Sequence, residues 1–352
     1  KRQPPDIFFL FLFIIPRFVQ KAKDKMKKFI KSVMLWSAVI CLIPFAANAD
    51  NARSAEKAAE LSAVSSESIS DASQLILPTD KLKIYTSNGI RTVTVEEYTV
   101  YAVLEEVPYI MDTEAMKAQA CAARTYAVRR ILSGEDPSTG AHITDDGDKY
   151  QICLTDVQAR EIYGESYSAA ISAAQSAAES TCGEVITYHG SPISAPFHLS
   201  SGEYTLSAES AWGKAFPYLV PAKNPEAAVF CSEKTFTSAE LRARISADFP
   251  AAGELEHIAL THIDGTEAVS EASLCGITVS GEDMARILSL ESSAFTVSEE
   301  GDTYIFTVTG SGHLVGMSIA GADAMSQDGC GYRDILAHYY TGTEVKRVVY
   351  GE

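Results

Sequence analysis

Residues 106–130 read EVPYIMDTEAMKAQACAARTYAVRR and predict the central element of the fold. After an acidic residue, a proline and a short spacer, the stretch becomes rich in alanine, the best helix former. We predict a helix over 113–132 with Asp112 or Thr113 as its N-cap, because both residue types are favoured there. Alanines crowd one face of this helix, so we expect it to pack closely against neighbouring elements.

Lys117 and Arg124 are isolated cations on this helix. Since a helix turns by about 100° per residue, a spacing of seven returns to nearly the same face. The two cations therefore share one stripe, with Glu114 one turn below Lys117. A solvated helix face is the ordinary interpretation, and presentation of the two cations to a ligand is the alternative.

The same stretch resembles the signature of the stage II sporulation protein D family, which includes amidase-enhancer relatives. Members of that family carry an Ala/Ser-X-Glu-Met-Pro segment followed by a helix like EALKAQAVAARTYA. The resemblance continues, in order, over most of residues 83–350. Its further segments are Tyr150-Gln151, SPISAPFHLSSGEYT (191–205), AWGKAFPYLV (211–220) and GSGHLVGMSIAGADAMSQDGCGYRDILAHYYTGTEV (310–345).

The resemblance implies that Glu106 is the acid and base of a lytic transglycosylase that cleaves peptidoglycan glycan strands. One carboxyl group suffices for this reaction. It protonates the leaving glycosidic oxygen and then accepts the proton of the muramyl 6-hydroxyl, which attacks the anomeric carbon. The product carries a 1,6-anhydromuramyl end. Val107 replaces the family's Met, and with Leu104 it is expected to desolvate Glu106 and keep it protonated. Without the resemblance, Glu105 and Glu106 are interpreted as a solvated acidic pair.

Some family members bind zinc near Tyr150 through one His and two Cys. Here Tyr150 takes the position of the second Cys, no cysteine occurs between Cys121 and Cys153, and His142 alone makes a poor zinc site. We therefore predict no metal and no cofactor. Tyr150 and Gln151 are expected to contact the substrate.

The matched segments imply further contacts to the glycan. The residues concerned are Lys117, Arg124, Ser200, Ser201, Gly202, Thr205, His313 and Ser318. Hydroxyl groups suit hydrogen bonds to sugars, and a glycine permits close approach. The chain departs from the family pattern at Glu203 and Leu314 (both Gly in the family), Ile319 (Gln) and Ala320 (Tyr). We expect these departures to alter the substrate or to weaken catalysis.

Other chemistries find little support in the sequence. A serine hydrolase is excluded because no G-x-S-x-G elbow occurs, and Walker and dinucleotide-binding loops are absent. Cys121 lies in mid-helix, which suggests packing. Trp212 and Tyr218 are candidates for stacking on sugar rings, with core packing as the usual alternative.

The N-terminal residues predict export. Residues 1–25 resemble translated upstream sequence, and residues 26–49 read as a signal peptide with a basic start, an apolar run and an Ala-Asn-Ala cleavage site. An uncleaved anchor is the alternative. Residues 50–80, rich in Ala, Ser and Glu, predict a flexible linker, and residues 81–352 predict the peptidoglycan-acting domain. The protein is thus expected outside the cytoplasm, at the cell wall.

The net charge of the protein limits the classes of molecule that it can bind. Residues 1–49 hold nine Lys/Arg and two Asp/Glu, so the net charge of −17 for the whole chain becomes −24 for residues 50–352. Such a surface repels nucleic acid and anionic membrane but permits a polysaccharide.

The pattern predicts an α+β fold in which Ala-rich helices pack on antiparallel sheets, with two lobes around a glycan-binding cleft as one arrangement. The run from Lys81 to Leu104 is β-rich, and its Asn88-Gly89 pair predicts a hairpin. A second Ala-rich helix is expected over 167–180 and strands over 183–198, with Gly190-Ser191-Pro192 as their turn. Several strands are expected over 255–310, and closing helices over 323–327 and 333–340. Scattered cysteines suggest small buried side chains, with Cys231–Cys275 as the disulfide to examine.

Two functions therefore remain. The first is a lytic transglycosylase acting in sporulation or wall remodelling. The alternative is a non-catalytic wall-binding protein that enhances a partner amidase.

Overall fold

The computed structural model describes residues 75–107, 110–147, 150–225, 229–255 and 257–350. The expected upstream segment, the signal peptide and most of the expected linker lie outside the described residues. Helices and sheets occur together in the described ranges, so the fold is α+β as predicted. The expected cleft stays a prediction. No helix in the described part of the chain is long and apolar enough to cross a bilayer.

The hairpin predicted from Asn88-Gly89 is present. Its strands are β2 (Lys81–Thr86) and β3 (Gly89–Thr94), and β4 (Ile143–Thr144) pairs in parallel with β2. Ser87 and Asn88 form the turn, because Thr86 pairs with Gly89. The φ of 105° at Gly89 is one that side-chain-bearing residues rarely adopt.

A helix follows the hairpin where the sequence is β-rich. This helix, α4, spans Val95–Glu106, so the expectation of strand up to Leu104 is wrong beyond Thr94. The Thr94 hydroxyl accepts a hydrogen bond from the Glu97 N–H at 3.0 Å and caps the helix. The acidic residues of the first turn, Glu96 and Glu97, stabilise the helix by interacting with the positive end of its dipole. Burial of the aromatic and β-branched residues then outweighs their weak helix propensity.

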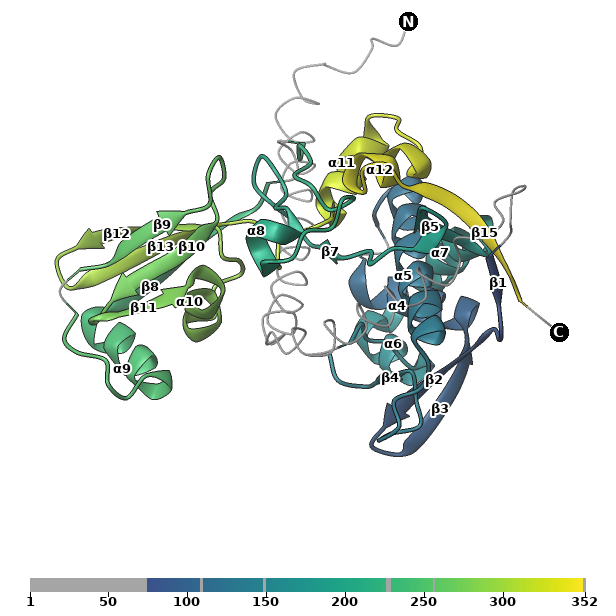
Figure 1. The fold of residues 1–352 in the computed structure, drawn as a ribbon, viewed down its shortest axis with the longest axis horizontal. Helices are drawn as coiled ribbons and strands as arrows, with labels where there is room; N and C mark the ends of the chain where they lie inside the picture. Colours follow the sequence, from purple (N-terminus) through teal and green to yellow (C-terminus); the bar gives the residue numbers. More distant parts are fainter. Residues whose placement is uncertain (1–74, 108–109, 148–149, 226–228, 256, 351–352) are drawn as a thin grey trace, which may run out of the picture. The chain divides into compact units, whose positions relative to one another are not determined.

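The predicted Ala-rich helix is confirmed as α5 (Thr113–Ser133). Asp112 is its N-cap, and Gly134 ends it with a φ of 83°. Helix α5 is the central element, because it contacts α4, β5, α7, α11 and α12 (Figure 1). Its alanines are almost all fully buried, as the close packing required. The neighbours of α5 after α4 are α7 (Tyr167–Ser180), β5 (Glu184–Tyr188), α11 (Ile319–Gln327) and α12 (Tyr332–Tyr339).

A four-stranded sheet lies beside these helices in the order β1-β15-β5-β6. Its remaining strands are β1 (Leu75–Leu77), β6 (Ser191–Pro192) and β15 (Glu344–Tyr350). Strand β1 runs parallel to β15 and buries Leu77 completely. Ordered structure therefore begins before Lys81, within the expected linker. Ser191 and Pro192 belong to a strand, so the turn before β6 lies at His189 and Gly190.

Residues 231–309 form two three-stranded antiparallel sheets with their own hydrophobic core. One sheet has the order β12-β13-β8 and the other β11-β10-β9, so the strands expected over 255–310 are confirmed. The core contains Phe236, Leu241, Met284, Phe295 and Phe306. The elements are β8 (Cys231–Thr237), α9 (Ser238–Asp248), β9 (Ala259–His262), β10 (Val269–Leu274), β11 (Ile277–Ser280), α10 (Gly281–Leu288), β12 (Phe295–Glu300) and β13 (Thr303–Thr309).

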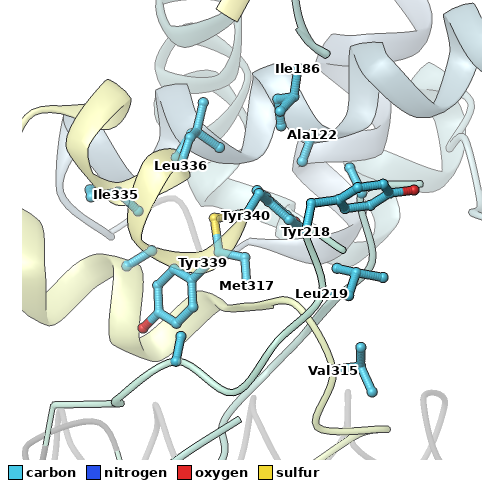
Figure 2. Close-up of a cluster of buried hydrophobic side chains, with 14 of the residues drawn as sticks. Ala122, Ile186, Tyr218, Leu219, Val315, Met317, Ile335, Leu336, Tyr339 and Tyr340 are labelled. Atoms are coloured by element: carbon cyan, nitrogen blue, oxygen red, sulfur yellow. The ribbon is translucent and has the colours of Figure 1, made fainter. Parts of the chain in front are cut away.

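Short elements bring two matched sequence segments together. Strand β7 (Phe197–His198) pairs in parallel with β14 (Met317–Ser318), so Met317 lies opposite Phe197. The largest core cluster surrounds this pair and includes residues of α5, β5 and α12. Figure 2 shows part of this cluster, with Tyr218, Met317 and Tyr340 packed close to one another. The remaining short elements are α6 (Asp156–Tyr163), η1 (Gly164–Ser166) and α8 (Ala208–Trp212).

All six cysteines in the described ranges are free. Cys231 is exposed and Cys275 is buried, so the disulfide singled out between them is not formed. Cys121 is buried inside α5, as expected for a packing residue.

Candidate active site

Glu106 is the last residue of α4 and is half-buried. Burial raises the pKa of its carboxyl from 4.5 to about 8, and the neighbouring Glu105 raises it further in the same direction. The negative end of a helix dipole also disfavours a carboxylate at this position. Glu106 is therefore protonated at neutral pH.

An apolar cluster adjoins Glu106, as the sequence predicted. Val103, Leu104 and Val107 are buried against Met116 and Ala120 of α5. Ile319 belongs to the same cluster and is 4% exposed. The replacement of the family's Gln by Ile at this position thus adds apolar surface near the end of α4, which favours a protonated acid.

Gln151 is tied to the helix that carries Glu106. The Tyr98 hydroxyl donates to Gln151 Oε1 at 2.9 Å, and the Gln151 N–H donates to the Tyr126 hydroxyl at 3.4 Å. Burial raises the pKa of Tyr98 well above its ordinary value, and Tyr126, Cys153 and Glu106 add to this shift. Tyr98 and Tyr126 are hydrogen-bond partners of Gln151 that sequence reasoning missed, because a tyrosine within a helix carries no motif.

Tyr150 is half-buried, and the Arg130 guanidinium lies 4.9 Å from its ring centroid. The backbone N–H of Lys83 donates to Nδ1 of His142 at 2.9 Å, so that imidazole is engaged in the fold. No group of three His, Cys, Asp or Glu residues in the described ranges is arranged to hold a metal ion.

Arg124 lies inside the protein, with none of its side chain exposed. Its Nε and Nη2 donate to the two carboxylate oxygens of Glu96 at 2.8 and 2.7 Å. The remaining N–H groups donate to the Thr181 hydroxyl and to the carbonyls of Ala178 and Glu184. All five donors are occupied, so this placement corrects the expectation that Arg124 presents its charge to a glycan. It fastens α5 to α4, α7 and β5 instead.

Lys117 is also held by protein groups. Its Nζ lies 2.6 Å from Glu114 Oε1 and 6.0 Å from the centroid of the Tyr332 ring. The Tyr332 N–H donates to the other oxygen of Glu114 at 2.9 Å. The side chain is 21% exposed, so Lys117 braces α12 against α5 while keeping limited access to solvent. A contact with substrate stays a prediction for this residue.

Gln119 lies on the same helix and is 1% exposed. Neither its Oε1 nor its Nε2 has a hydrogen-bond partner within the described part of the chain.

The segment around Ser200 turns its hydroxyl groups inward. Ser200, Ser201 and Thr205 are fully buried, and the Thr205 hydroxyl accepts from the Ala222 N–H at 2.9 Å. A Cβ at Gly202 would lie 3.0 Å from Glu267 Oε2. The group that approaches Gly202 closely is therefore the side chain of Glu267.

The second matched segment lies beside the first. The Ser318 hydroxyl accepts from the Gly321 N–H at 3.0 Å and caps α11. His313 is half-buried, and its ring centroid lies 5.8 Å from that of His198 and 5.4 Å from that of Trp212. Leu314 has a φ of 63°, so it keeps a left-handed conformation that suits the glycine of the family pattern.

The two aromatic candidates differ in placement. Tyr218 is 6% exposed and its hydroxyl accepts from the Ser194 N–H at 3.1 Å, so it is a core residue and not a platform for a sugar ring. Trp212 is half-buried and meets His313 edge-on.

The buried acid makes stability depend on pH. A carboxyl whose pKa is higher in the folded state contributes stability that is complete below about pH 4.5 and is lost as the pH rises through about 8. We expect Glu106→Gln to unfold like the parent at pH 4 and to be more stable by about 1–3 kcal/mol at pH 8, with half-burial limiting the gain. Urea unfolding of both proteins at the two pH values measures this. Equal free energies of unfolding at pH 8 would contradict a desolvated Glu106.

The amino-acid sequence is similar to those of known proteins. The family described as Stage II sporulation protein matches residues 85–188. Stage II sporulation protein D of Bacillus subtilis (strain 168) is 32% identical over 335 residues, which cover 91% of this chain and 96% of that protein. The protein of the same name from Bacillus amyloliquefaciens is 32% identical over 266 residues, or 74% of this chain and 76% of that one. The Amidase enhancer of Bacillus subtilis (strain 168) is 26% identical over 293 residues, which cover 68% of this chain and 39% of that protein. With this similarity over nearly its whole length, the chain belongs to the stage II sporulation protein D family.

Proposed function

We propose that this protein is a peptidoglycan lytic transglycosylase with Glu106 as its general acid and base. The observation that carries the proposal is a half-buried carboxyl at the end of α4, next to an apolar cluster and protonated at neutral pH. A glycosidic oxygen must gain a proton as it leaves, and a carboxyl with a raised pKa can supply one.

The proposed reaction balances with one carboxyl group. Glu106 donates its proton to the glycosidic oxygen while the bond from that oxygen to the anomeric carbon breaks. The 6-hydroxyl of the same muramyl residue bonds to the anomeric carbon, and its proton passes to Glu106. The acid is restored, no water is consumed, and the new end is a 1,6-anhydromuramyl group. Glu105, whose pKa burial raises to about 6, needs no part in this scheme.

The proposal also covers the biological role of the protein, its location and the residues that contact the glycan. The relatives are named for stage II sporulation, which supports a cell-wall role during sporulation. We place residues 81–352 outside the cytoplasm, exported or anchored through residues 26–49. Tyr150, Gln151, Lys117 and the segments at Ser200 and His313 are proposed to border the glycan.

A second function has an observation in its favour. The Amidase enhancer shares 26% identity with this chain, and Ile319 and Ala320 replace a polar and an aromatic residue of the family pattern. A non-catalytic protein that binds the wall and stimulates an amidase would tolerate those changes.

Cleavage should decline in alkaline solution. A general acid works only while protonated, so we expect the rate on purified glycan strands to fall as the pH rises through about 8, the pKa of Glu106. Initial rates between pH 5 and pH 10 measure this. A rate that stays level to pH 10 would argue against Glu106 as the acid.

A further inference from the structure

The last turn of α4 lacks a backbone donor. The final hydrogen bond of the helix runs from the Val107 N–H to the Val103 carbonyl at 3.0 Å. The next bond in the series would need an N–H at position 108 to donate to the Leu104 carbonyl. Residue 108 is a proline, which has no N–H. The Leu104 carbonyl, two residues before Glu106, therefore needs a donor from elsewhere in the protein.

The hydroxyl group of Tyr163 supplies this donor. It lies 2.6 Å from the Leu104 carbonyl oxygen and 3.5 Å from that of Val107, so its proton is directed to Leu104. Leu104 is 1% exposed, and water therefore has little access to this carbonyl. Tyr163 is half-buried and packs against the apolar cluster that adjoins Glu106.

Helix α6 holds Tyr163 in this position. Asp156, in the first turn of α6, accepts hydrogen bonds from the hydroxyl of Tyr101 on α4, at 3.3 Å, and from the hydroxyl of Tyr167 on α7. Tyr101 and Leu104 are about one turn apart on α4. Helix α6 thus binds two consecutive turns of α4, the first through Asp156 and the last through Tyr163.

The surroundings of the Glu106 carboxyl depend on this last turn. Burial is the main cause that raises the pKa of Glu106 to about 8, and Glu105 is the charged neighbour that adds to it. A buried carbonyl that loses its donor draws water toward itself, because an unsatisfied acceptor is costly. Water at the end of α4 would hydrate the Glu106 carboxylate and lower the pKa of this group.

We infer that Tyr163 is a positioning residue of the reaction. Its hydroxyl group takes the place of the N–H that Pro108 lacks, and it thereby fixes the turn of α4 that carries Glu106. Tyr163 acts through the backbone and transfers no proton to the glycan. This inference rests on the proposed function and deepens it, because it assigns to α6 the placement of the acid.

Tyr163→Phe in the full chain tests the inference, because it removes the hydroxyl and keeps the ring. We expect kcat for the cleavage of glycan strands to fall about tenfold to a hundredfold, the effect of a slightly misplaced catalytic group. KM should stay within about twofold, since no contact with the substrate is lost. The alkaline decline of the rate should begin at a lower pH than in the parent, as the pKa of Glu106 falls toward 4.5.

The pKa of Glu106 can also be measured without any cleavage. An NMR titration of isotope-labelled glutamate carboxyl groups reports it, and Glu106→Gln identifies the signal by its absence. We expect a lower pKa for Glu106 in Tyr163→Phe than in the parent.

Tyr167→Phe is the matched control. Tyr167 is also half-buried and packs against the same apolar cluster, but its hydroxyl donates to Asp156 and not to a carbonyl of α4. Both variants should lower the melting temperature by about 2–4 °C, because each loses one hydrogen bond. With Tyr167→Phe we expect kcat to stay within about threefold of the parent and the pKa of Glu106 to stay unchanged.

Three results would overturn the inference. They are a pKa of Glu106 in Tyr163→Phe that is not below that of the parent, equal losses of kcat in the two variants, and a loss confined to KM. The parent protein tests the proposed function separately. If the parent cleaves no strand while Tyr163→Phe alone lowers the pKa of Glu106, the placement of the carboxyl by Tyr163 stands and the proposed function fails.

Discussion

Glu106→Gln is expected to lower the rate of glycan cleavage by about 10²–10⁴-fold, the usual contribution of a general acid. The substitution keeps the size of the side chain but removes the proton that the leaving oxygen needs. Because the carboxyl is buried at a cost, the variant should fold at least as well as the parent at neutral pH. Loss of activity together with retained or increased stability is the combined result that identifies the acid.

Glu105→Gln is the matched control for this experiment. Glu105 adjoins Glu106 and its pKa is also raised, to about 6, so its substitution changes the same local charge. We expect its cleavage rate to stay within about threefold of the parent, because in our scheme it transfers no proton. Equal losses in the two variants would show that charge or folding, and not proton transfer, limits the reaction.

The second large effect is expected at Arg124. Replacing it with Met leaves Glu96 without its bidentate partner and leaves the carbonyls of Ala178 and Glu184 without these donors. Removal of one partner of a fully buried ion pair typically costs about 3–5 kcal/mol, but Glu96 is 32% exposed and keeps part of its hydration, so a cost of about 2–3 kcal/mol is expected here. We expect Arg124→Met to lose about that much stability in urea unfolding and to lose activity only as far as it unfolds.

Lys117→Met is the control for the helix α5 cations. Lys117 makes a partly exposed ion pair with Glu114, and such pairs contribute about 1 kcal/mol or less. A small loss of stability is therefore expected for Lys117→Met.

The prediction for Arg124 has a clear contrary outcome. If Arg124→Met folds normally and loses glycan binding, Arg124 contacts the substrate and the structural account of it is wrong.

Local signals predicted several elements well. Asn88-Gly89 gave the hairpin, and alanine content with an Asp N-cap gave α5 nearly to its ends. These features depend on residues close together in the chain. Helix α4 was missed because its aromatic and β-branched residues favour strand, whereas burial against α5 and the Thr94 cap decide the outcome.

Long-range contacts explain what the sequence left undetermined at the site. Periodicity placed Lys117 and Arg124 on one stripe, but it did not show that α7 and β5 cover Arg124 or that Tyr332 faces Lys117. The resemblance singled out Glu106, and the apolar cluster that raises its pKa includes Ile319, more than 200 residues away along the chain. The hydrogen bond from the Tyr163 hydroxyl to the Leu104 carbonyl likewise joins residues that are 59 positions apart in the chain.

The most direct test of Glu106 as the acid of a lytic transglycosylase is mass analysis of glycan strands, with and without stem peptides, after incubation with the full chain. The account predicts fragments that end in 1,6-anhydromuramyl groups, formed by the parent and by Glu105→Gln and absent with Glu106→Gln. Fragments with reducing ends would instead show hydrolysis by water. Strands that bind the protein without any new ends would contradict the account and establish a wall-binding protein.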